Sequence, residues 1–412
     1  MKKIMILGAG AGQIPFINIC KKKGAYVIVI SPRGKYPGIE AADRHYACDT
    51  RDKEQILEIA RKENIDAVTT DQTDVSVPAA AYVAEQMGLR GIGYQKALQF
   101  TDKYAMYCAA KQTGIYVPEF AMACSLSEAE EAIHKTGLPA IIKPSNSSGS
   151  RGVYRINTIE ALADCFKNSI RFSSTQSIIV EEFIEGREYI VDGFAMDGKY
   201  RNLDLGIKEY FQKEGSYISK MCMFSSADLI EDDVEKQVMD ANRTLIKGMG
   251  LEFGITHGEY IYSQNRGKVY LVEVAARGGG VFLSSDLTPK ASGIHTNELL
   301  LDYLLDGSVT DVDAWKLDRK VAAWRCFALK KGVIKHIKNV DRLKAVDGVD
   351  KVCLDGLKIG TYAEELSDDT TKYGPVLVSG DSRDSCYKIL DEVENLLDIV
   401  TEEDGRTAAI IW

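Results

Sequence analysis

The sequence lacks the features that mark several large classes of protein. None of its apolar runs reaches the roughly 18 uninterrupted residues of a membrane-spanning helix. The apolar run at the N-terminus is short and ends in glycines that begin a turn, so we expect no secretory signal. The net charge is −9 and the pI about 5.3, so the general basic character of nucleic-acid-binding proteins is missing. We therefore expect neither a membrane nor a nucleic-acid partner.

The cysteines and histidines form no metal or disulfide pattern. The nine cysteines are odd in number, scattered and never spaced as CxxC, and no His/Cys pair has the spacing of zinc ligands. Dispersed thiols of this kind fit a reducing compartment. We therefore expect a cytoplasmic protein in which each cysteine acts as a small buried hydrophobic residue.

What is present is the composition of a globular protein with more than one domain. The chain has 412 residues, 45% of them hydrophobic and 27% charged, and this length favours two to four domains. The first 98 residues alternate apolar, β-branched runs with amphipathic segments, which predicts a parallel sheet covered by helices. The predicted strands are residues 3–7, 26–30 and 66–70, and the predicted helices are residues 13–23, 52–63 and 78–87.

A glycine-rich turn, GAGAG at residues 8–12, follows the first predicted strand. The dinucleotide-binding fingerprint GxGxxG requires glycine at position 13, where this chain has Gln13. The second strand also lacks a closing acidic residue, because it runs into Ser31. The turn therefore favours a tight connection at a strand end over a nicotinamide or flavin site.

From about residue 99 the pattern changes to mixed helices and strands, and no internal repeat is present. Helices are predicted at residues 101–112, 160–168, 232–249, 297–305 and 385–399, and strands at 140–143, 177–182 and through much of 190–275. From about residue 320 short strands and turns precede the final helix. The fold class is therefore α/β for the N-terminal part and α+β for the rest.

The first segment with a chemical signature is Lys143 with the loop that follows, KPSNSSGSRG at residues 143–152. Glycine and serine let backbone N–H groups turn toward an anion, and a lysine at a strand end supplies positive charge for phosphate oxygens. Here the lysine precedes the glycines, unlike in the Walker sequence. Such a loop alone is often a solvated turn, but the lysine directly before it favours a phosphate site.

A second segment, EEFIEGRE at residues 181–188, combines an acidic pair with two large apolar residues and a glycine. It fits a strand that leads into a turn. It equally fits a hinge whose backbone hydrogen-bonds a purine while apolar side chains enclose it. The residues by themselves leave both interpretations open.

Two glutamates, Glu259 and Glu273, lie in predicted strands that are joined by a turn at residues 264–267. A hairpin there would bring the two carboxylates together, which is costly unless a cation lies between them. Oxygen ligands without a His/Cys pair favour magnesium over zinc. Arg277 and three glycines follow at once. The segment therefore predicts a magnesium site.

Taken in this order, the three segments resemble the ATP-grasp superfamily, which includes biotin carboxylase, carbamoyl-phosphate synthetase, glycinamide ribonucleotide synthetase and L-amino acid ligases. The resemblance spans essentially the whole chain. It implies a Rossmann-like N-terminal domain at residues 1–98, a two-lobed ATP-grasp core at 99–305 (lobes at about 99–178 and 179–305) and a small C-terminal α+β domain at 306–412. The segment GPVLVSGD at residues 374–381 is similar to the C-terminal domains of carboxylate–amine ligases.

The resemblance also implies roles for individual residues, and these fall into three groups. The nucleotide group comprises the phosphate-neutralising lysines Lys103 and Lys143, the phosphate-covering loop with Ser148, Gly149 and Ser150, the adenine hinge Glu181, Glu182, Phe183 and Ile184, and Glu188 as the acid on the ribose or phosphate side. The metal group comprises Glu259 and Glu273. The catalytic group contains Arg277, which is similar to the arginine that stabilises the charge of the acyl phosphate.

Three further residues bear on the chemistry. The family often has asparagine two residues after the second metal glutamate, whereas this chain has Ala275, so a second magnesium ion lacks one of its usual oxygen ligands. His257 faces the same side of its strand as Glu259. It is expected either to orient the acceptor or accept its proton, or only to be hydrogen-bonded in the pocket wall. Lys208 is a candidate for holding a substrate carboxylate.

The resemblance implies an ATP- and Mg²⁺-dependent ligase, with Mn²⁺ as an alternative metal, that activates a small-molecule carboxylate as an acyl phosphate and joins it to an amine. ADP and phosphate are the other products. A purine-pathway or carboxyphosphate-forming enzyme, such as a phosphoribosylglycinamide synthetase-like ligase, shares the same core residues. Ala275 also leaves open a non-catalytic nucleotide-binding protein. A homodimer is the commonest arrangement among soluble oligomers.

Overall fold

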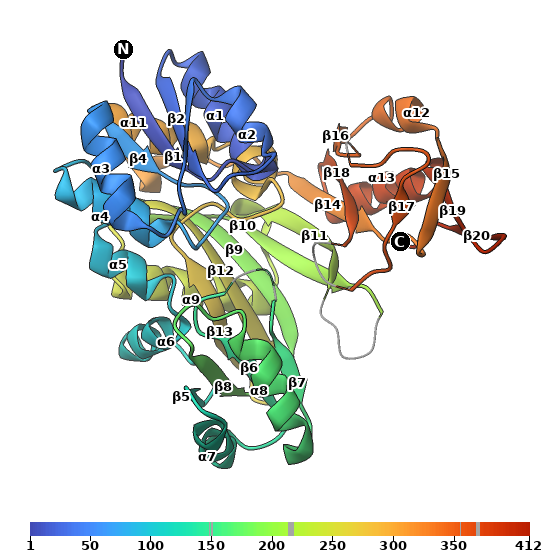
Figure 1. Ribbon diagram of the computed structural model, residues 1–412, viewed down its shortest axis with the longest axis horizontal. Coiled ribbons are helices and arrows are strands. Elements are labelled where there is room, and N and C mark those ends of the chain that lie inside the picture. Colours follow the sequence, from blue (N-terminus) through green and yellow to red (C-terminus); the bar gives the residue numbers. More distant parts are fainter. Residues whose placement is uncertain (148, 150, 213–217, 355, 368–370) are drawn as a thin grey trace. The chain divides into compact units, whose positions relative to one another are not determined.

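The computed structural model describes residues 1–147, 149, 151–212, 218–354, 356–367 and 371–412 (Figure 1). The chain forms two compact units. The first contains Met1–Leu203, Glu231–Pro289 and Ile294–Lys316, and the second contains Asp204–Ile230, Lys290–Gly293 and Leu317–Trp412. This division does not follow chain order, and the three domain boundaries given by the sequence stay predictions.

The first unit begins with a parallel sheet in the order β3-β2-β1-β4. Its strands are β1 (Lys3–Leu7), β2 (Tyr26–Ser31), β3 (Arg44–Ala47) and β4 (Ala67–Thr69). The helices around it are η1 (Ala11–Gln13), α1 (Ile14–Lys22), α2 (Pro37–Ala41), α3 (Lys53–Glu63), α4 (Val77–Gln86) and α5 (Tyr94–Gln99). The apolar runs of β1 and β2 are buried because helices cover both faces (Figure 1), as expected for a parallel sheet. The predicted α/β arrangement is confirmed.

The glycine turn after β1 is closed by the side chain of Gln13. Its Oε1 accepts a hydrogen bond from the backbone N–H of Gly10 at 2.8 Å, and its Nε2 donates to the backbone oxygen of Asp71 at 2.6 Å. Gly8 has φ +112°, a conformation that side chains rarely adopt, and a Cβ there would lie 3.2 Å from Gln13. The turn is therefore a tight connection in which Gln13 fills the space beside the glycines.

A four-stranded antiparallel sheet in the order β5-β8-β6-β7 forms the next part of the first unit. Its strands are β5 (Phe120–Ala123), β6 (Ala140–Pro144), β7 (Tyr154–Ile156) and β8 (Ile178–Glu182). The neighbouring helices are α6 (Lys103–Gln112), α7 (Leu126–Thr136), η2 (Ile159–Ala161) and α8 (Leu162–Ile170). Apolar residues of α7 and α8 pack on one face of this sheet. Because β6 pairs with β8, Lys143 and Glu181 lie on neighbouring strands.

The rest of the first unit is built on long antiparallel strands in the order β13-β12-β9. They are β9 (Arg187–Met196), β12 (Phe253–Ser263) and β13 (Lys268–Ala275), and the first residues of β10 (Lys199–Tyr210) also belong here. The helices of this part are α9 (Asp233–Gly248), η4 (Leu283–Leu287), α11 (Thr296–Asp306) and η5 (Val312–Ala314), and the first two residues of α10 (Thr288–Ser292) also belong here. The β12–β13 hairpin predicted from the sequence is confirmed.

The second unit contains two antiparallel arrangements. In one, the end of β10 is followed by β11 (Ser219–Ser226), β14 (Val321–Phe327), β18 (Tyr373–Gly380) and β16 (Val349–Val352). The other has the order β17-β15-β19-β20, with β15 (Gly332–Lys338), β17 (Tyr362–Ala363), β19 (Asp398–Glu403) and β20 (Arg406–Ala409). The helices are η3 (Ala227–Leu229), α12 (Val340–Lys344) and α13 (Arg383–Leu396).

The predicted end of the final helix was wrong. The prediction extended the helix to residue 399, whereas α13 ends at Leu396 and β19 begins at Asp398. Ile399 and Val400 are β-branched and pair with β15, so strand pairing takes these residues out of the helix. Separately, among the residues described, no helix combines the length and apolar character needed to cross a bilayer.

Candidate functional site

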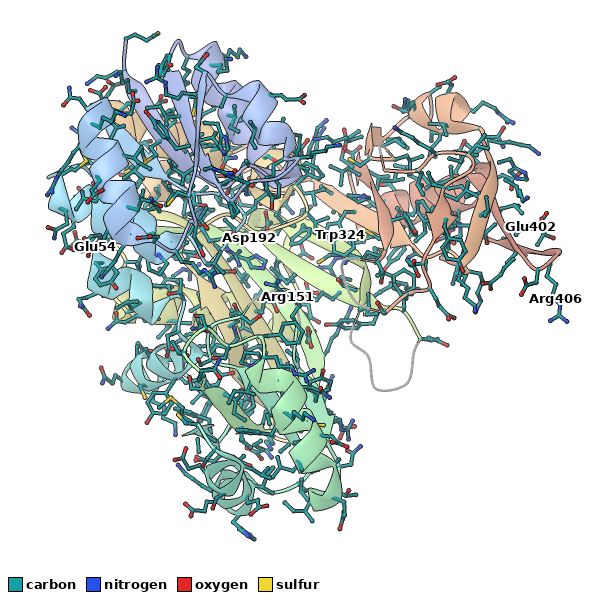
Figure 2. The ribbon with its side chains drawn as sticks, in the orientation of Figure 1. Glu54, Arg151, Asp192, Trp324, Glu402 and Arg406 are labelled. Atoms are coloured by element: carbon teal, nitrogen blue, oxygen red, sulfur yellow. The ribbon has the colours of Figure 1, made fainter. Side chains whose placement is uncertain are left out.

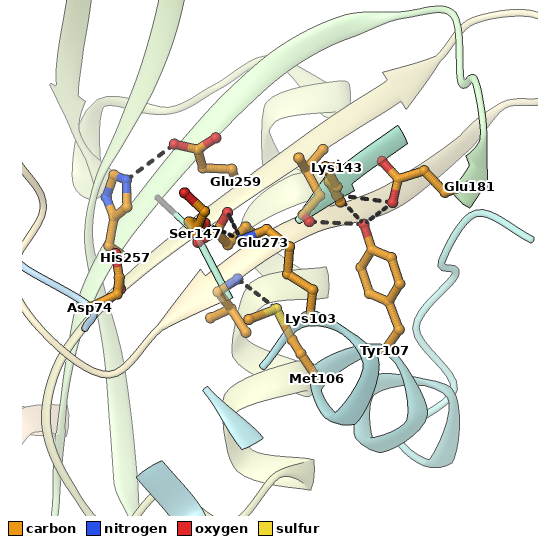
Figure 3. A network of polar contacts seen from close by, with 12 residues as sticks. Asp74, Lys103, Met106, Tyr107, Lys143, Ser147, Glu181, His257, Glu259 and Glu273 are labelled. Atoms are coloured by element: carbon orange, nitrogen blue, oxygen red, sulfur yellow. Dashed lines mark hydrogen bonds and ion pairs between the residues drawn. The ribbon is translucent and has the colours of Figure 1, made fainter. Parts of the chain in front are cut away.

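The β12–β13 hairpin places Glu259 and Glu273 directly opposite each other (Figure 3). The pairing shifts register just after Glu259, so Val272 is an extra residue on the β13 side. The two carboxylate side chains are 28% and 27% exposed, so neither is fully solvated. Like charges directly opposite on paired strands destabilise a sheet unless cations offset them. The hairpin therefore concentrates negative charge at one point.

Lys103 supplies one of these cations. It begins α6, which Asp102 caps by accepting a hydrogen bond from the backbone N–H of Ala105 at 2.9 Å. Its Nζ lies 3.2 Å from Glu273 Oε2 and donates to the backbone oxygen of Ser147 at 2.8 Å (Figure 3). The side chain is only 6% exposed. Lys103 therefore links the carboxylates of the hairpin to the Ser/Gly loop after β6.

Lys143 lies in a second, buried polar group with Tyr107 and Glu181 (Figure 3). Its Nζ is 2.9 Å from Glu181 Oε2 and 3.0 Å from the Tyr107 hydroxyl oxygen. That hydroxyl lies 2.8 Å from Glu181 Oε2 and 2.9 Å from the backbone oxygen of Val272, and it donates its one proton to one of them. Burial, followed by the negative charge of Glu181, raises the pKa of Tyr107 well above its ordinary value.

Tyr107 was missed by the sequence reasoning, although a signal existed. It follows Lys103 by four residues on α6 and so occupies the same face of the helix. The Glu181 side chain was assigned to an adenine hinge, and in the structure it is directed to Lys143 and Tyr107.

The other residues of the predicted hinge have partners of their own. The carboxylate of Glu182 is 2.5 Å from Nη2 of Arg266, and the guanidinium of Arg155 lies 4.0 Å from the ring centre of Phe183. Backbone N–H groups of Glu182 and Phe183 donate to the carbonyl oxygens of residues 119 and 139. Ile184 is buried, and Glu188 lies on β9 opposite Ile261. Any purine bound here would use the backbone beyond Phe183.

The Ser/Gly loop is anchored at its start. The backbone oxygen of Ser145 accepts from the backbone N–H of Lys103 at 3.0 Å, and its hydroxyl lies 2.8 Å from that of Ser177. Gly149 and Gly152 have φ of +70° and +75°, which side chains rarely adopt. Ser148 and Ser150, two of the predicted phosphate ligands, lie outside the residues that the structure describes.

His257 is held between two carboxylates. Its Nδ1 is 2.9 Å from Asp192 Oδ1, and its Nε2 is 3.4 Å from Glu259 Oε1. Burial by itself disfavours the charged imidazolium, but the charge and hydrogen bond of Asp192, with Glu259, raise the pKa of His257 to about 9. Asp192, which lies in the interior on β9 (Figure 2), was not singled out from the sequence.

Arg277 is paired with Asp74, a residue of the loop after β4. Its Nε lies 2.8 Å from Asp74 Oδ1 and its Nη2 lies 2.6 Å from Asp74 Oδ2. Burial alone would lower the pKa of Arg277, but the charge of Asp74 and the hydrogen bonds to it raise that pKa above its ordinary value. Nothing in the sequence indicated this partner, because Asp74 lies 203 residues before Arg277.

Lys208, the remaining candidate for a substrate carboxylate, belongs to the second unit. It lies on β10 opposite Cys222 of β11.

The donor set suits a hard divalent cation. Within the part of the chain that the structure describes, no three His, Cys, Asp or Glu side chains gather as a metal centre, and the hairpin supplies two carboxylates. Two carboxylates with remaining positions for water or phosphate oxygens are typical of magnesium, which is seldom held by protein ligands alone. Glu259 and Glu273 therefore fit a magnesium ion that is shared with a phosphate-bearing substrate.

Comparison with known proteins agrees with this arrangement. Residues 136–285 match the ATP-grasp domain, and residues 325–402 match L-amino acid ligase C-terminal domain 2. The chain is 26% identical over 291 residues to alanine–anticapsin ligase of Bacillus subtilis, a match that covers 65% of this chain and 60% of the relative. It is also 26% identical to formate-dependent phosphoribosylglycinamide formyltransferase of Methanocella arvoryzae, over 67% of this chain and 66% of the relative.

The same fold occurs in solved structures. The L-amino acid ligase from Bacillus licheniformis superposes with a TM-score of 0.81 at 20% identity, covering 98% of this chain and 99% of that one. The similarity to C-terminal domains of carboxylate–amine ligases that the sequence indicated is confirmed by the match at residues 325–402. The chain thus has the fold of these ligases and carries an ATP-grasp domain at residues 136–285 and an L-amino acid ligase C-terminal domain at residues 325–402.

Proposed function

We propose that this chain is an ATP- and Mg²⁺-dependent ligase that activates a carboxylate as an acyl phosphate and joins it to an amine. The supporting observation is the convergence of two buried lysines with the two opposed carboxylates of the β12–β13 hairpin. Lys103 contacts Glu273 directly. Lys143 is held by Glu181 and by Tyr107, which follows Lys103 by one turn of α6. Such a set of charges suits a nucleoside triphosphate with its metal.

In this proposal the nucleotide lies between the two lobes of the core. Lys103 and Lys143 neutralise its phosphates, and the loop at residues 145–152 covers them and excludes water. The backbone near Ile184 meets the adenine, because the N–H groups of Glu182 and Phe183 are already engaged. Glu188 is assigned to the ribose or phosphate side.

Glu259 and Glu273 would hold magnesium, or manganese in its place, and that ion would offset charge on the phosphate oxygens. The substrate carboxylate attacks the γ-phosphorus and ADP departs. The amine then attacks the carbonyl carbon of the acyl phosphate and inorganic phosphate departs. Arg277 meets the negative charge that builds up during these steps. Because little covalent chemistry is required of the protein, positioning and charge account for most of its contribution.

His257 is assigned to substrate orientation. Asp192 Oδ1 lies 2.9 Å from Nδ1 of His257 and holds the ring beside Glu259, which suits a group that orients a substrate. We also propose that the protein acts on small molecules in the cytoplasm and that it forms homodimers.

A second candidate is an enzyme of the formate- or carboxyphosphate-using type, which the match to the phosphoribosylglycinamide formyltransferase favours. The C-terminal match at residues 325–402 favours the amino acid ligase type instead. The non-catalytic alternative rests on Ala275 alone, opposite His257 in the hairpin.

The test is phosphate release from Mg–ATP by the purified protein, with pools of carboxylates, amines, and formate or bicarbonate with ribonucleotide amines. Release that requires one carboxylate and one amine supports the ligase and identifies both substrates. Release that depends on formate or bicarbonate favours the second candidate. ATP binding without release in any pool favours the non-catalytic alternative, and absence of ATP binding contradicts all three.

A further inference from the structure

The loop at residues 70–74 contacts the segment that follows β13 at three places. The hydroxyl of Ser284 lies 3.1 and 3.2 Å from the two carboxylate oxygens of Asp71. The side-chain oxygen of Gln72 accepts the backbone N–H of Phe282 at 3.2 Å. Asp74 holds Arg277. The loop at the strand end of the N-terminal sheet therefore fixes the backbone on both sides of the three glycines at residues 278–280.

The backbone between these contacts has little freedom to move. A Cβ at Gly278 would lie 2.2 Å from Asp71 Oδ1 and 2.3 Å from the Ser284 hydroxyl, so this position requires glycine. Val281 and Phe282 have φ of 55° and 61°, a left-handed conformation that β-branched and bulky residues rarely adopt. Residues held in such conformations persist where surrounding contacts over-determine them, and they cluster at functional sites.

The pair formed by Arg277 and Asp74 fixes the plane of the guanidinium. Two parallel N–H···O contacts at 2.8 and 2.6 Å make a bidentate fork, the geometry that gives arginine its directional specificity. Nη1 donates to the backbone oxygen of Gly278 at 3.0 Å. Three of the five N–H groups are used in this way, so N–H groups of Nη1 and Nη2 remain to meet an anionic oxygen.

Other carboxylates also attract this arginine. The negative charges of Glu273 and Glu259 act on Arg277 along with that of Asp74. These are the two groups assigned to the metal. A guanidinium without Asp74 would be drawn toward them, which would turn the N–H groups away from the substrate.

We propose that Asp74 is a positioning residue for catalysis, which orients Arg277 toward the reacting phosphoryl group and keeps it away from Glu259 and Glu273. This rests on the proposed ligase function. The alternative is that the pair only ties two segments of the fold together, which predicts lost stability without a specific loss of turnover.

Asp74→Asn is the informative variant, because it keeps the shape of the side chain and removes its charge. We expect kcat to fall by about tenfold to a hundredfold, with the KM for ATP changed by less than about threefold, since Arg277 is needed mainly in the transition state. In the double variant with Arg277→Lys, kcat should be no more than about twofold below that of Arg277→Lys alone, because residues that act as a unit are not additive.

Glu63→Gln is the matched control. Glu63 is another buried carboxylate of the N-terminal sheet region, and it pairs with Arg44 at 2.5 Å. The Glu63→Gln substitution should lower the temperature of unfolding while leaving kcat unchanged. An Asp74→Asn variant that loses stability like this control but keeps wild-type kcat, or whose effect multiplies with that of Arg277→Lys, would overturn the proposal.

A measurement without turnover separates this proposal from the ligase assignment. In ¹⁵N-arginine-labelled protein, the Nε–H signal of Arg277, assigned by its loss in Arg277→Lys, should exchange slowly with solvent. In Asp74→Asn the exchange should be at least about tenfold faster, and in Glu63→Gln it should be unchanged. Unchanged exchange in Asp74→Asn overturns the orienting role even in an active enzyme. Faster exchange in a protein with no ATP-dependent activity means that the ligase assignment is what fails.

Discussion

The hydroxyl oxygen of Tyr107 lies 3.0 Å from the ammonium nitrogen of Lys143, inside a buried polar group. The same hydroxyl lies 2.8 Å from Glu181, so one tyrosine holds both members of an ion pair between β6 and β8. Buried ion pairs depend on such additional hydrogen bonds, because removing two charges from water is costly. Tyr107 therefore helps to fix the position of the Lys143 charge.

Replacing Tyr107 by phenylalanine should weaken ATP binding. The ring would keep its packing against Phe120, at 5.1 Å between ring centres, while the hydroxyl is lost. A hydrogen bond to a charged group contributes about 1.5–3 kcal/mol, so the KM for ATP should rise by about tenfold or more. Tyr104→Phe is the control, since Tyr104 lies on the same helix and packs on the same Phe120. An unchanged KM for ATP in Tyr107→Phe would contradict the role given to Tyr107.

Glu273→Ala should abolish turnover and leave the fold intact. The variant removes one of two carboxylates expected to hold magnesium, and it also relieves the repulsion from Glu259 directly opposite. Loss of one charge-stabilising element typically lowers kcat by about a hundredfold or more. Phosphate release and thermal unfolding measure the two effects separately. Removal of metal from the wild-type protein with EDTA should have the same effect on turnover and be reversed by Mg²⁺ or Mn²⁺. If activity survives in Glu273→Ala, the metal assignment is wrong.

Asn242 should be a strong determinant of stability. It is fully buried under β9 and β12, where its amide donates to Tyr200 and Asn202 and its oxygen accepts from Tyr260 at 2.8 Å. Asn242→Ala removes one hydrogen bond from each of these partners and opens a cavity, at a cost of about 2–4 kcal/mol. The temperature of unfolding should therefore drop by several degrees. Asn395→Ala, at an exposed position of α13, should leave it nearly unchanged.

The change of the unfolding temperature with pH, below neutral pH, should depend on the ionisation of Glu63. The hydrogen bond from Tyr46 lowers the pKa of Glu63, burial opposes this effect, and Arg44 lowers the pKa further. A carboxyl whose pKa is lower in the folded state contributes stability above its unfolded pKa of about 4.3, and that contribution is lost as the pH falls through the folded pKa. Glu63→Gln should thus unfold at a lower temperature than wild type at pH 7. The difference should shrink below about pH 4. A constant difference down to pH 3 would show that the charge of Glu63 is not the cause.

Local sequence determined much of the fold. The strands β1 and β2 follow from apolar, β-branched runs, and α3 follows from an amphipathic segment that Asp52 caps. That Glu259 and Glu273 lie near each other was also predictable, because a four-residue turn joins their strands. The register set by that turn would pair Glu259 with Val272, and the bulge at Val272 is what places Glu273 directly opposite Glu259. The predicted final helix was too long. Pairing of Ile399 with β15, a strand about sixty residues earlier in the sequence, competes with helix formation there.

Only the tertiary structure decided which side chains complete the site. Asp74 meets Arg277 across 203 residues of sequence, Asp192 meets His257 across 65, and Glu181 meets Tyr107 across 74. None of these pairs lies within one helix, hairpin or turn, so no local periodicity relates them. The sequence by itself determined the chemical type of each segment and the carboxylate pair of one hairpin. Which carboxylate holds each cation was decided by how the sheets pack, because a buried charge takes the partner that the fold brings within hydrogen-bonding distance.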